Sequence, residues 1–236
     1  LLAEQSVDMY AIQTVLDLSG VVDAGRLRVA AQAVLDRYPN LRTAFVTYAD
    51  GNAVQVVLDR IDVPWRTVDL SGAVDVEAAV AGVLAQDQAV RFDMAAPPLL
   101  RFTLVTLAPG RFKLVLANHH ILLDGWSLPL LMRDLLALYA TRGEVSVLPR
   151  VRSYRSYLAW LAEQDREASL RVWERALSGV GEPTMLAPSG APTDITARSG
   201  EIPIAVDAEL GDALTALAGR LGVTVNTVTQ AAWGLI

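Results

Sequence analysis

The hydrophobic pattern of the first forty residues predicts a strand followed by a helix. Apolar or β-branched residues occupy every second position from Tyr10 to Leu18, which is the period of a half-buried strand. From Asp23 to Arg37 the apolar positions recur at helical spacing, and we expect Asp23 to cap this helix and Pro39 to end it. The predicted buried face of the helix comprises Leu27, Ala30, Ala31, Val34 and Leu35.

Two further pairs of extended runs are each joined by a short turn that contains glycine: 41–49 with 53–58, and 99–106 with 111–117. The first turn carries an Asp-Gly dipeptide, which favours a hairpin between flanking strands. The second carries Pro-Gly, and its second strand leads directly into the only two histidines of the chain. We therefore expect two antiparallel hairpins.

Helical spacing predicts most of the remaining elements, over 74–89, 127–139, 154–164, 166–177, 210–221 and from 224 or 226 to 236. Ser127 is expected to cap the second of these helices, and Trp173 is expected in the core. Ile202, Ile204 and Val206 alternate as a strand would. Strands interleaved with helices and antiparallel hairpins indicate the α+β class.

Composition and charge exclude several classes of function. With 53% hydrophobic residues in 236, the chain can bury a sizeable core, yet no apolar run reaches the length of a membrane span and no signal peptide is visible. A net charge of −6 argues against binding nucleic acid. The absence of cysteine excludes disulfides and a thiol nucleophile, and it suits a cytoplasmic protein.

Titratable chemistry near neutral pH is concentrated at His119 and His120, because histidine is the side chain whose ordinary pKa suits proton transfer there. Asp124 follows four residues after His120, and Gly125 comes directly after Asp124, at the expected junction of a strand and a helix. Adjacent side chains on extended backbone point to opposite faces, and no cysteine could complete a tetrahedral site. We therefore expect no metal centre.

The segment 118–127, Asn-His-His-Ile-Leu-Leu-Asp-Gly-Trp-Ser, resembles the His-His-x-x-x-Asp-Gly signature of the condensation domains of nonribosomal peptide synthetases. These domains belong to the chloramphenicol-acetyltransferase-like superfamily. Three other segments agree with the family in order: 36–45 resembles its arginine motif, 154–161 its tyrosine-rich segment, and 222–228 the start of its second lobe. One such motif would be weak evidence, whereas the ordered set is specific.

The resemblance implies an α+β fold of two chloramphenicol-acetyltransferase-like lobes, each a mixed or antiparallel sheet packed with helices, with the active site in a tunnel between them. We expect residues 1–178 to form the N-terminal lobe, 179–200 a linker rich in Gly, Pro, Ser and Thr, and 201–236 the beginning of the C-terminal lobe. Both ends of the sequence look cut. The isolated chain is therefore expected to be inactive, because the tunnel needs walls from both lobes.

The resemblance also implies an acyltransferase that forms peptide bonds in the biosynthesis of an antibiotic or a siderophore. The amine of an acceptor aminoacyl thioester attacks a donor aminoacyl or peptidyl thioester. Both substrates are carried on phosphopantetheine arms of upstream and downstream carrier proteins, next to an adenylation domain, and the chain itself binds no cofactor. Leu122-Leu123 and Leu128-Pro129 resemble domains whose donor ends in a D-residue.

His120 matches the second histidine of the family motif, and it would deprotonate the attacking amine or position it. His119 is expected to pack or form hydrogen bonds beneath the site. Gly125 would let the backbone approach the substrate, with its N–H facing an oxyanion. Trp126 would line the tunnel or pack in the core.

Asp124 has two interpretations, which the sequence leaves open. It could orient His120, or it could be the ion-pair partner of Arg37 or Arg42, which match the two arginines of the upstream family motif. We favour the ion pair. In that case Asp124 would be structural, and removing it would leave an uncompensated guanidinium.

Related functions remain as alternatives. Epimerisation domains share the motif but use a Glu of the second lobe and usually carry Val-Ser-Trp after the glycine, where this chain has Trp126-Ser127. Cyclisation domains replace the histidine pair with an aspartate motif, which this chain does not carry. Recruitment modules that only dock carrier proteins or oxygenases lose the second His or the Gly, and this chain keeps both. A stand-alone acyl-CoA transferase is a further alternative.

Overall fold

The computed structural model describes residue 8, residues 10–181 and residues 203–235. The chain divides into two compact units. The described part of the larger unit comprises residue 8 and residues 10–181, and the described part of the smaller unit comprises residues 203–235. The two units are described separately below.

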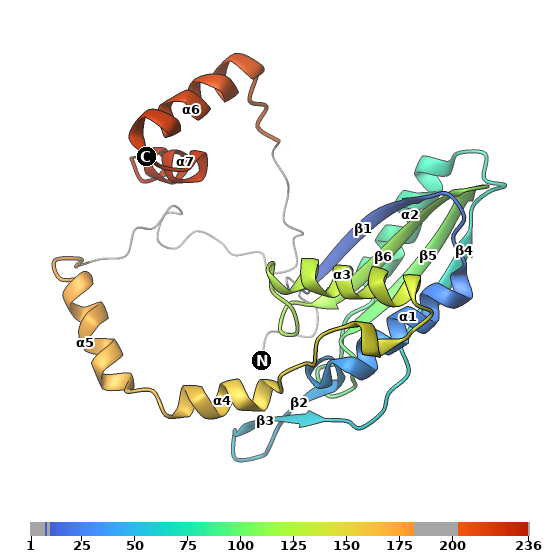
Figure 1. Ribbon diagram of the computed structural model, residues 1–236, viewed down its shortest axis with the longest axis horizontal. Helices are drawn as coiled ribbons and strands as arrows, with labels where there is room; N and C mark the ends of the chain where they lie inside the picture. Colours follow the sequence, from blue (N-terminus) through green and yellow to red (C-terminus); the bar gives the residue numbers. More distant parts are fainter. Residues whose placement is uncertain (1–7, 9, 182–202, 236) are drawn as a thin grey trace. The chain divides into compact units, whose positions relative to one another are not determined.

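The larger unit is built on a four-stranded sheet in the order β1-β6-β5-β4 (Figure 1). The strands are β1 (Ala11–Ser19), β6 (Arg111–His119), β5 (Leu100–Ala108) and β4 (Trp65–Asp69). β6 pairs antiparallel with β1 over its whole length and with β5 over residues 111–118, and β4 pairs parallel with β5. The strand that ends at His119 is therefore internal to the sheet, with pairing on both sides.

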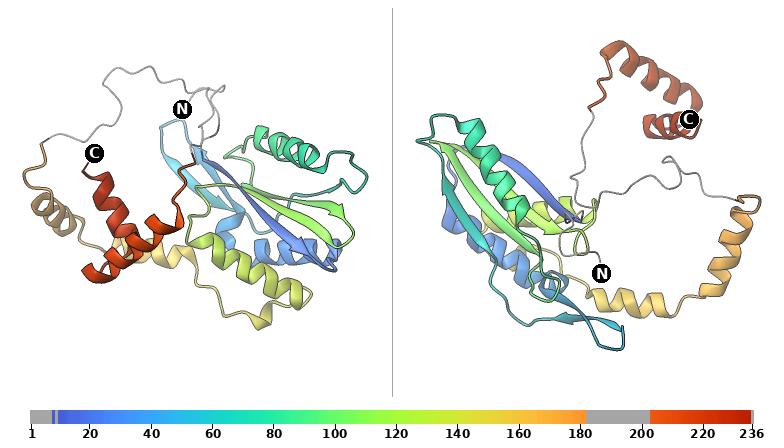
Figure 2. Two further views of the ribbon diagram at one scale, coloured as in Figure 1. Left: turned by 90° about the horizontal axis from the view of Figure 1, so that it is seen from above. Right: turned by 180° about the vertical axis from the view of Figure 1, so that it is seen from behind.

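Helices cover both faces of this sheet, as the two views of Figure 2 show. α1 (Ala24–Arg37) and α3 (Ser127–Ala140) pack on one face, against the even-numbered side chains of β5 and β6 such as Phe102 and Leu116. α2 (Val76–Ala89) packs on the other face, against odd-numbered ones such as Val105 and Val115. Alternation along each strand thus divides the core into two layers. The α+β class is confirmed.

The predicted face of α1 is buried as expected, with all five of its predicted residues at most 3% exposed. Asp23 caps the helix by accepting a hydrogen bond from the Arg26 N–H. The chain then forms the short 3₁₀ helix η1 (Pro39–Arg42) and the hairpin of β2 (Thr43–Thr47) and β3 (Ala53–Val57). Gly51 lies in the hairpin turn at a φ of +86°, where a side chain would be strained.

Three shorter elements follow α3: the 3₁₀ helix η2 (Val145–Val147), α4 (Tyr154–Ala162) and α5 (Arg166–Ala176). Neither α4 nor α5 contains a buried residue. Trp173 is 64% exposed, so the prediction that it belongs to the core is wrong for the described residues. Helical spacing identified α5 correctly, but it could not show whether the apolar face has a partner.

The smaller unit contains α6 (Ala208–Leu221) and α7 (Val225–Trp233). Gly222 ends α6 in the left-handed region, and Thr224 caps α7 through the Thr227 N–H at 3.1 Å. The expected alternating strand has no counterpart here, because residues 203–207 pair with no described strand. Most of the expected linker, and Ile202, lie outside the described residues.

One strand was not predicted from the sequence, and one predicted helix cap is wrong. β4 was not anticipated, because its sequence is mostly polar and it pairs only at the edge of the sheet. Ser127 is the first residue of α3 and not its cap. The carboxylate of Asp124 accepts a hydrogen bond from the Ser127 N–H, as the side chain of a capping residue would.

Among the described residues, no helix is long and apolar enough to cross a membrane.

Candidate active site

The two histidines lie where β6 ends and the loop to α3 begins. His119 is the last residue of the strand and pairs with Ala11 of β1. The N–H of His120 donates to the Tyr10 carbonyl at 2.7 Å, which extends the pairing by one residue. The Leu122 N–H then donates to the His119 carbonyl at 3.0 Å and turns the chain. The sheet therefore fixes the start of the loop.

His119 is held on the sheet side of this loop, with its side chain 13% exposed. Its Nδ1 accepts the Ile121 N–H at 3.1 Å, so in the neutral ring Nε2 carries the proton and lies 3.7 Å from the Asp8 carboxylate. Burial lowers the pKa of His119, Asp8 opposes the shift and His120 adds to it. His119 is thus placed as a neutral ring beneath the loop.

His120 has the opposite environment. It is exposed, and its Nδ1 lies 2.8 Å from the Leu123 carbonyl. Because a carbonyl oxygen can only accept, Nδ1 must carry the proton of the neutral ring. The lone pair therefore resides on Nε2, which is the arrangement a proton acceptor needs.

Asp124 is exposed and bonds to the start of α3. One of its oxygens accepts the Ser127 N–H at 2.8 Å and the Ser127 hydroxyl at 2.6 Å. These bonds from Ser127 lower the pKa of Asp124. Among the described residues neither Arg37 nor Arg42 pairs with it, so the expected ion pair is wrong. Asp124 does not bond to His120 either.

The aspartate that pairs with Arg37 is Asp134, which the sequence analysis did not identify. Its carboxylate is fully buried, lies 3.4 Å from Arg37 Nε, and accepts hydrogen bonds from Tyr38 and Arg133. Burial raises the pKa of Asp134, but the bonds from Tyr38 and Arg133 and the two positive charges outweigh it and leave the pKa lowered. The signal was available, because Asp134 interrupts the apolar stripe of α3.

Arg42 has a different structural role. Its side chain donates to three backbone carbonyls, those of Leu58 at 2.9 Å, Leu35 at 2.7 Å and Asp36 at 2.6 Å. These carbonyls belong to the end of β3 and the end of α1. Arg42 thus fastens the β2–β3 hairpin to the helix.

The exposed ring of His120 opens onto a cleft of about 860 Å³. The loop of residues 120–124 forms one wall, and α4 contributes Tyr154, Arg155 and Leu158 to another. The hairpin forms another wall that the sequence analysis did not foresee, with Thr43, Phe45, Ala53, Val54, Gln55 and Val57. A cleft of this size, lined by polar and apolar residues in similar proportion, fits a small-molecule substrate that carries polar groups.

The remaining predicted site residues lie beside this cleft or outside it. Asp124 and Ser127 line it, whereas His119, Gly125 and Trp126 do not. A Cβ on Gly125 would meet nothing within 4 Å, so the described residues do not require glycine there. Trp126 is 86% exposed, which contradicts the core interpretation. The described part of the chain also holds no group of three His, Cys, Asp or Glu side chains suited to a metal ion.

Comparisons with known proteins find chains that are similar to this one. The family model described as "Condensation domain" matches residues 2–236. The chain is 35% identical to chondramide synthase cmdD from Chondromyces crocatus, over 97% of this chain and 6% of that protein. It is 31% identical to bacitracin synthase 3 from Bacillus licheniformis, over 99% of this chain and 4% of that protein.

The solved structure of the SgcC5 protein from Streptomyces globisporus is similar in fold, with a TM-score of 0.76 and 26% identity. The match covers 97% of this chain and 53% of that one. The chain thus spans about half the length of a solved relative, and a few per cent of the synthases it resembles.

Proposed function

Because the chain belongs to the condensation-domain family, we propose that it forms part of an acyltransferase that makes amide bonds between two thioester-bound acyl groups. The acceptor amine attacks the carbonyl carbon of the donor thioester. A C–N bond forms, the C–S bond breaks, and the donor's thiol is released. One proton must leave the attacking nitrogen, and one must reach the departing sulfur.

In this proposal, His120 handles that proton. The observation that carries the assignment is the bond from its Nδ1–H to the Leu123 carbonyl, which leaves Nε2 unprotonated beside the cleft. Nε2 accepts the proton of the attacking amine and delivers it to the sulfur, so the ring ends as it began. A positioned base of this kind contributes about 10²–10⁴-fold. Holding the two substrates together contributes further, as about 7–11 kcal/mol of the barrier.

The other site residues support this step. Asp124 holds the start of α3 through Ser127, and the loop of His120 is therefore tied to the helix. Gly125 leaves its side of the loop open for a close approach by the substrate or by another part of the protein. Arg37 and Arg42 stabilise the scaffold through Asp134 and the hairpin.

The proposed assembly follows from the family. The acyl groups are carried on phosphopantetheine arms of donor and acceptor carrier proteins, next to an adenylation domain, and the chain itself binds no cofactor. Residues 1–178 form the N-terminal lobe, 179–200 the linker, and 201–236 the beginning of the C-terminal lobe. The cytoplasmic location stays a prediction.

The test is an amide-forming assay with the complete condensation domain. Donor and acceptor carrier proteins are loaded with aminoacyl groups, and intact mass identifies the product on the acceptor. We expect amide formation by the complete domain and none by residues 1–236 alone. A complete, folded domain that makes no amide from any loaded pair would contradict the proposal. Donors of D- and L-configuration in the same assay test the expected preference for a D-residue.

A further inference from the structure

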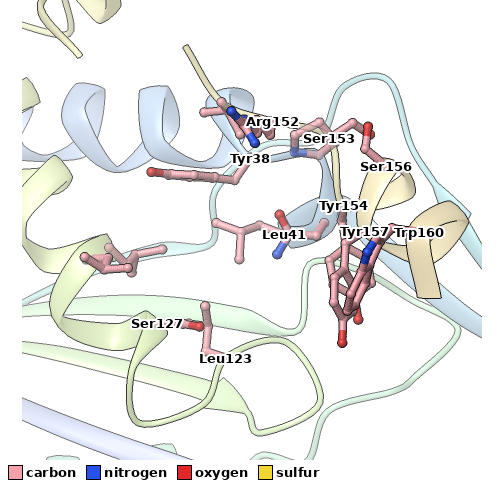
Figure 3. A pocket seen from close by; sticks show the side chains of 15 residues that line it. Tyr38, Leu41, Leu123, Ser127, Arg152, Ser153, Tyr154, Ser156, Tyr157 and Trp160 are labelled. Carbon is pink, nitrogen blue, oxygen red and sulfur yellow. The ribbon is translucent and has the colours of Figure 1, made fainter. Parts of the chain in front are cut away.

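A second cavity of about 620 Å³ adjoins the cleft of His120. The two cavities share six lining residues: Pro39, Asn40, Leu123, Ser127, Ser153 and Tyr154. His120 and the hairpin do not line the second cavity. We call it the aromatic chamber, because Tyr154, Tyr157 and Trp160 of α4 form one side of it (Figure 3).

The walls of the aromatic chamber are predominantly apolar. Leu41, Leu123 and Leu131 lie in it and are buried, at most 6% exposed, so the floor belongs to the core itself. The three aromatic rings stand in a row, with centroids 5.6 Å and 5.7 Å apart between neighbours. Among the described residues that line the chamber, Arg152 is the only charged one. Such a surface favours an alkyl or aryl group over a charged one.

Leu123 connects this chamber to the site. Figure 3 shows its side chain at the chamber together with that of Ser127. The carbonyl of the same residue accepts the hydrogen bond from His120 Nδ1. The proton acceptor and the apolar chamber therefore lie on two sides of one residue.

We propose that the aromatic chamber receives the apolar or aromatic side chain of one of the two acyl groups that react beside His120. The inference rests on the proposed function and adds a substrate class to it. A reaction between two acyl groups must accommodate two side chains, and the continuity of the chamber with the cleft makes it reachable from the reacting carbonyl. Its volume falls within the range of about 300–1,000 Å³ that is typical of ligand pockets.

Filling or enlarging the chamber tests this assignment in the complete condensation domain. Ser156→Phe adds a ring to the lining, and its matched control, Ala159→Phe, adds the same ring to α4 outside both cavities. Leu130→Ala removes side-chain volume from the lining, and its control is Leu136→Ala, at an exposed position of α3 outside both cavities. Thermal melting of all four variants verifies that they fold.

The readout is competition between phenylalanyl and alanyl groups loaded on the carrier proteins. The competing pair is presented once as donors and once as acceptors, which distinguishes the two sources of the side chain. We expect Ser156→Phe to lower the ratio of phenylalanyl to alanyl product by about 10-fold or more in one of the two arms. Leu130→Ala is expected to raise the ratio in the same arm, and both controls should match the wild type.

Unchanged ratios in Ser156→Phe and Leu130→Ala would overturn the inference, and so would an equal loss of both products. Either result would show that the chamber does not receive the side chain of the reacting acyl group. Isothermal titration calorimetry separates this failure from a failure of the proposed function. The N-acetylcysteamine thioester of 3-phenylpropionate should bind the wild type more tightly than the acetyl thioester, and Ser156→Phe should abolish the difference. Equal binding of the two thioesters by the wild type would overturn the inference even if the domain forms no amide.

Discussion

Two aspartates near α3 are held in different ways. Asp124 precedes the helix and is exposed, and its carboxylate bonds to Ser127, three residues away. Asp134 lies in the middle of the helix and is fully buried. It contacts Arg37 and Tyr38, at the end of α1, and its own neighbour Arg133. The first set of contacts is local and shapes a loop, whereas the second is long-range and fixes two helices.

The difference separates scaffold from site. A buried charge needs partners on several sides, and Asp134 has them, so removing one partner would leave an uncompensated buried charge. The loop of His120 is fixed by short-range bonds that water can reach, which is typical of segments that must meet a substrate. We therefore expect substitutions in the cluster of Asp134 to change stability, and substitutions in the loop to change turnover.

The largest expected effect is that of Asp134→Ala. Removing the carboxylate leaves the guanidinium of Arg37, only 10% exposed, without its buried partner. We expect a loss of about 3–5 kcal/mol in the free energy of unfolding, measured by urea denaturation of the complete domain. The double variant Arg37→Met/Asp134→Leu serves as the control and should recover most of the loss. A single variant as stable as the wild type would show that the ion pair is not structural.

His120→Ala should affect turnover and leave the fold intact. The ring is exposed and its one side-chain bond goes to a backbone carbonyl, so the melting temperature should stay within the error of the wild type. Turnover at saturating carrier proteins should fall by about 100-fold or more if proton transfer limits the rate. Near-normal turnover would remove His120 from the mechanism.

The loss of stability caused by Asp124→Ala should lie between those caused by Asp134→Ala and His120→Ala. It removes two hydrogen bonds at the start of α3, as the loss of a helix cap does, and a cap is worth about 0.5–2 kcal/mol. Asp124→Asn keeps an accepting oxygen and should retain most of that stability. A stability loss as large as that of Asp134→Ala would mean that Asp124 pairs with an arginine in the complete domain.

The smallest expected effect is the fall in melting temperature as the pH is lowered. Because the pKa of His119 is lowered in the folded protein, His119 contributes fully to the free energy of unfolding above pH 6.5, the ordinary pKa of the ring. This contribution is lost as the pH falls below 6.5. The lowered pKa of Asp134 means that its contribution is complete above 3.8 and is lost only as the pH falls through the lower, folded value. Melting temperature should therefore decline in two steps. His119→Gln should remove the first step alone, and a one-step profile in the wild type would contradict the assignment.

Local pattern was sufficient for most elements of the fold. β1, α1, both hairpins and the helices after residue 74 are determined by the spacing of apolar side chains and by Gly or Pro turns between them, which are properties of neighbouring residues. The position of the site also followed, because the two histidines end a strand that the pattern predicts. β4 did not follow, since it exists through its pairing with β5.

The partners of the charged side chains could not be predicted from the same pattern. Arg37 is separated by almost a hundred residues from Asp134, and only the packing of α1 against α3 brings them together. Asp124 matched a motif, and the motif suggested an ion pair that the geometry does not make. The hairpin wall of the cleft was missed for the same reason, because the anchoring of the hairpin by Arg42 is a tertiary contact.

The pairing of β1 with β6 has a consequence for where this protein can be divided in engineering. All nine residues of β1 are in register with the strand that ends at His119, and β1 is an edge of the sheet. A recombinant protein that starts after Ser19 would leave β6 as the new edge, with its N–H and C=O groups unpaired beside the histidines. Such an edge recruits strands from other molecules. A recombinant version of this protein should therefore begin upstream of Asp8, or its site will be prone to aggregation.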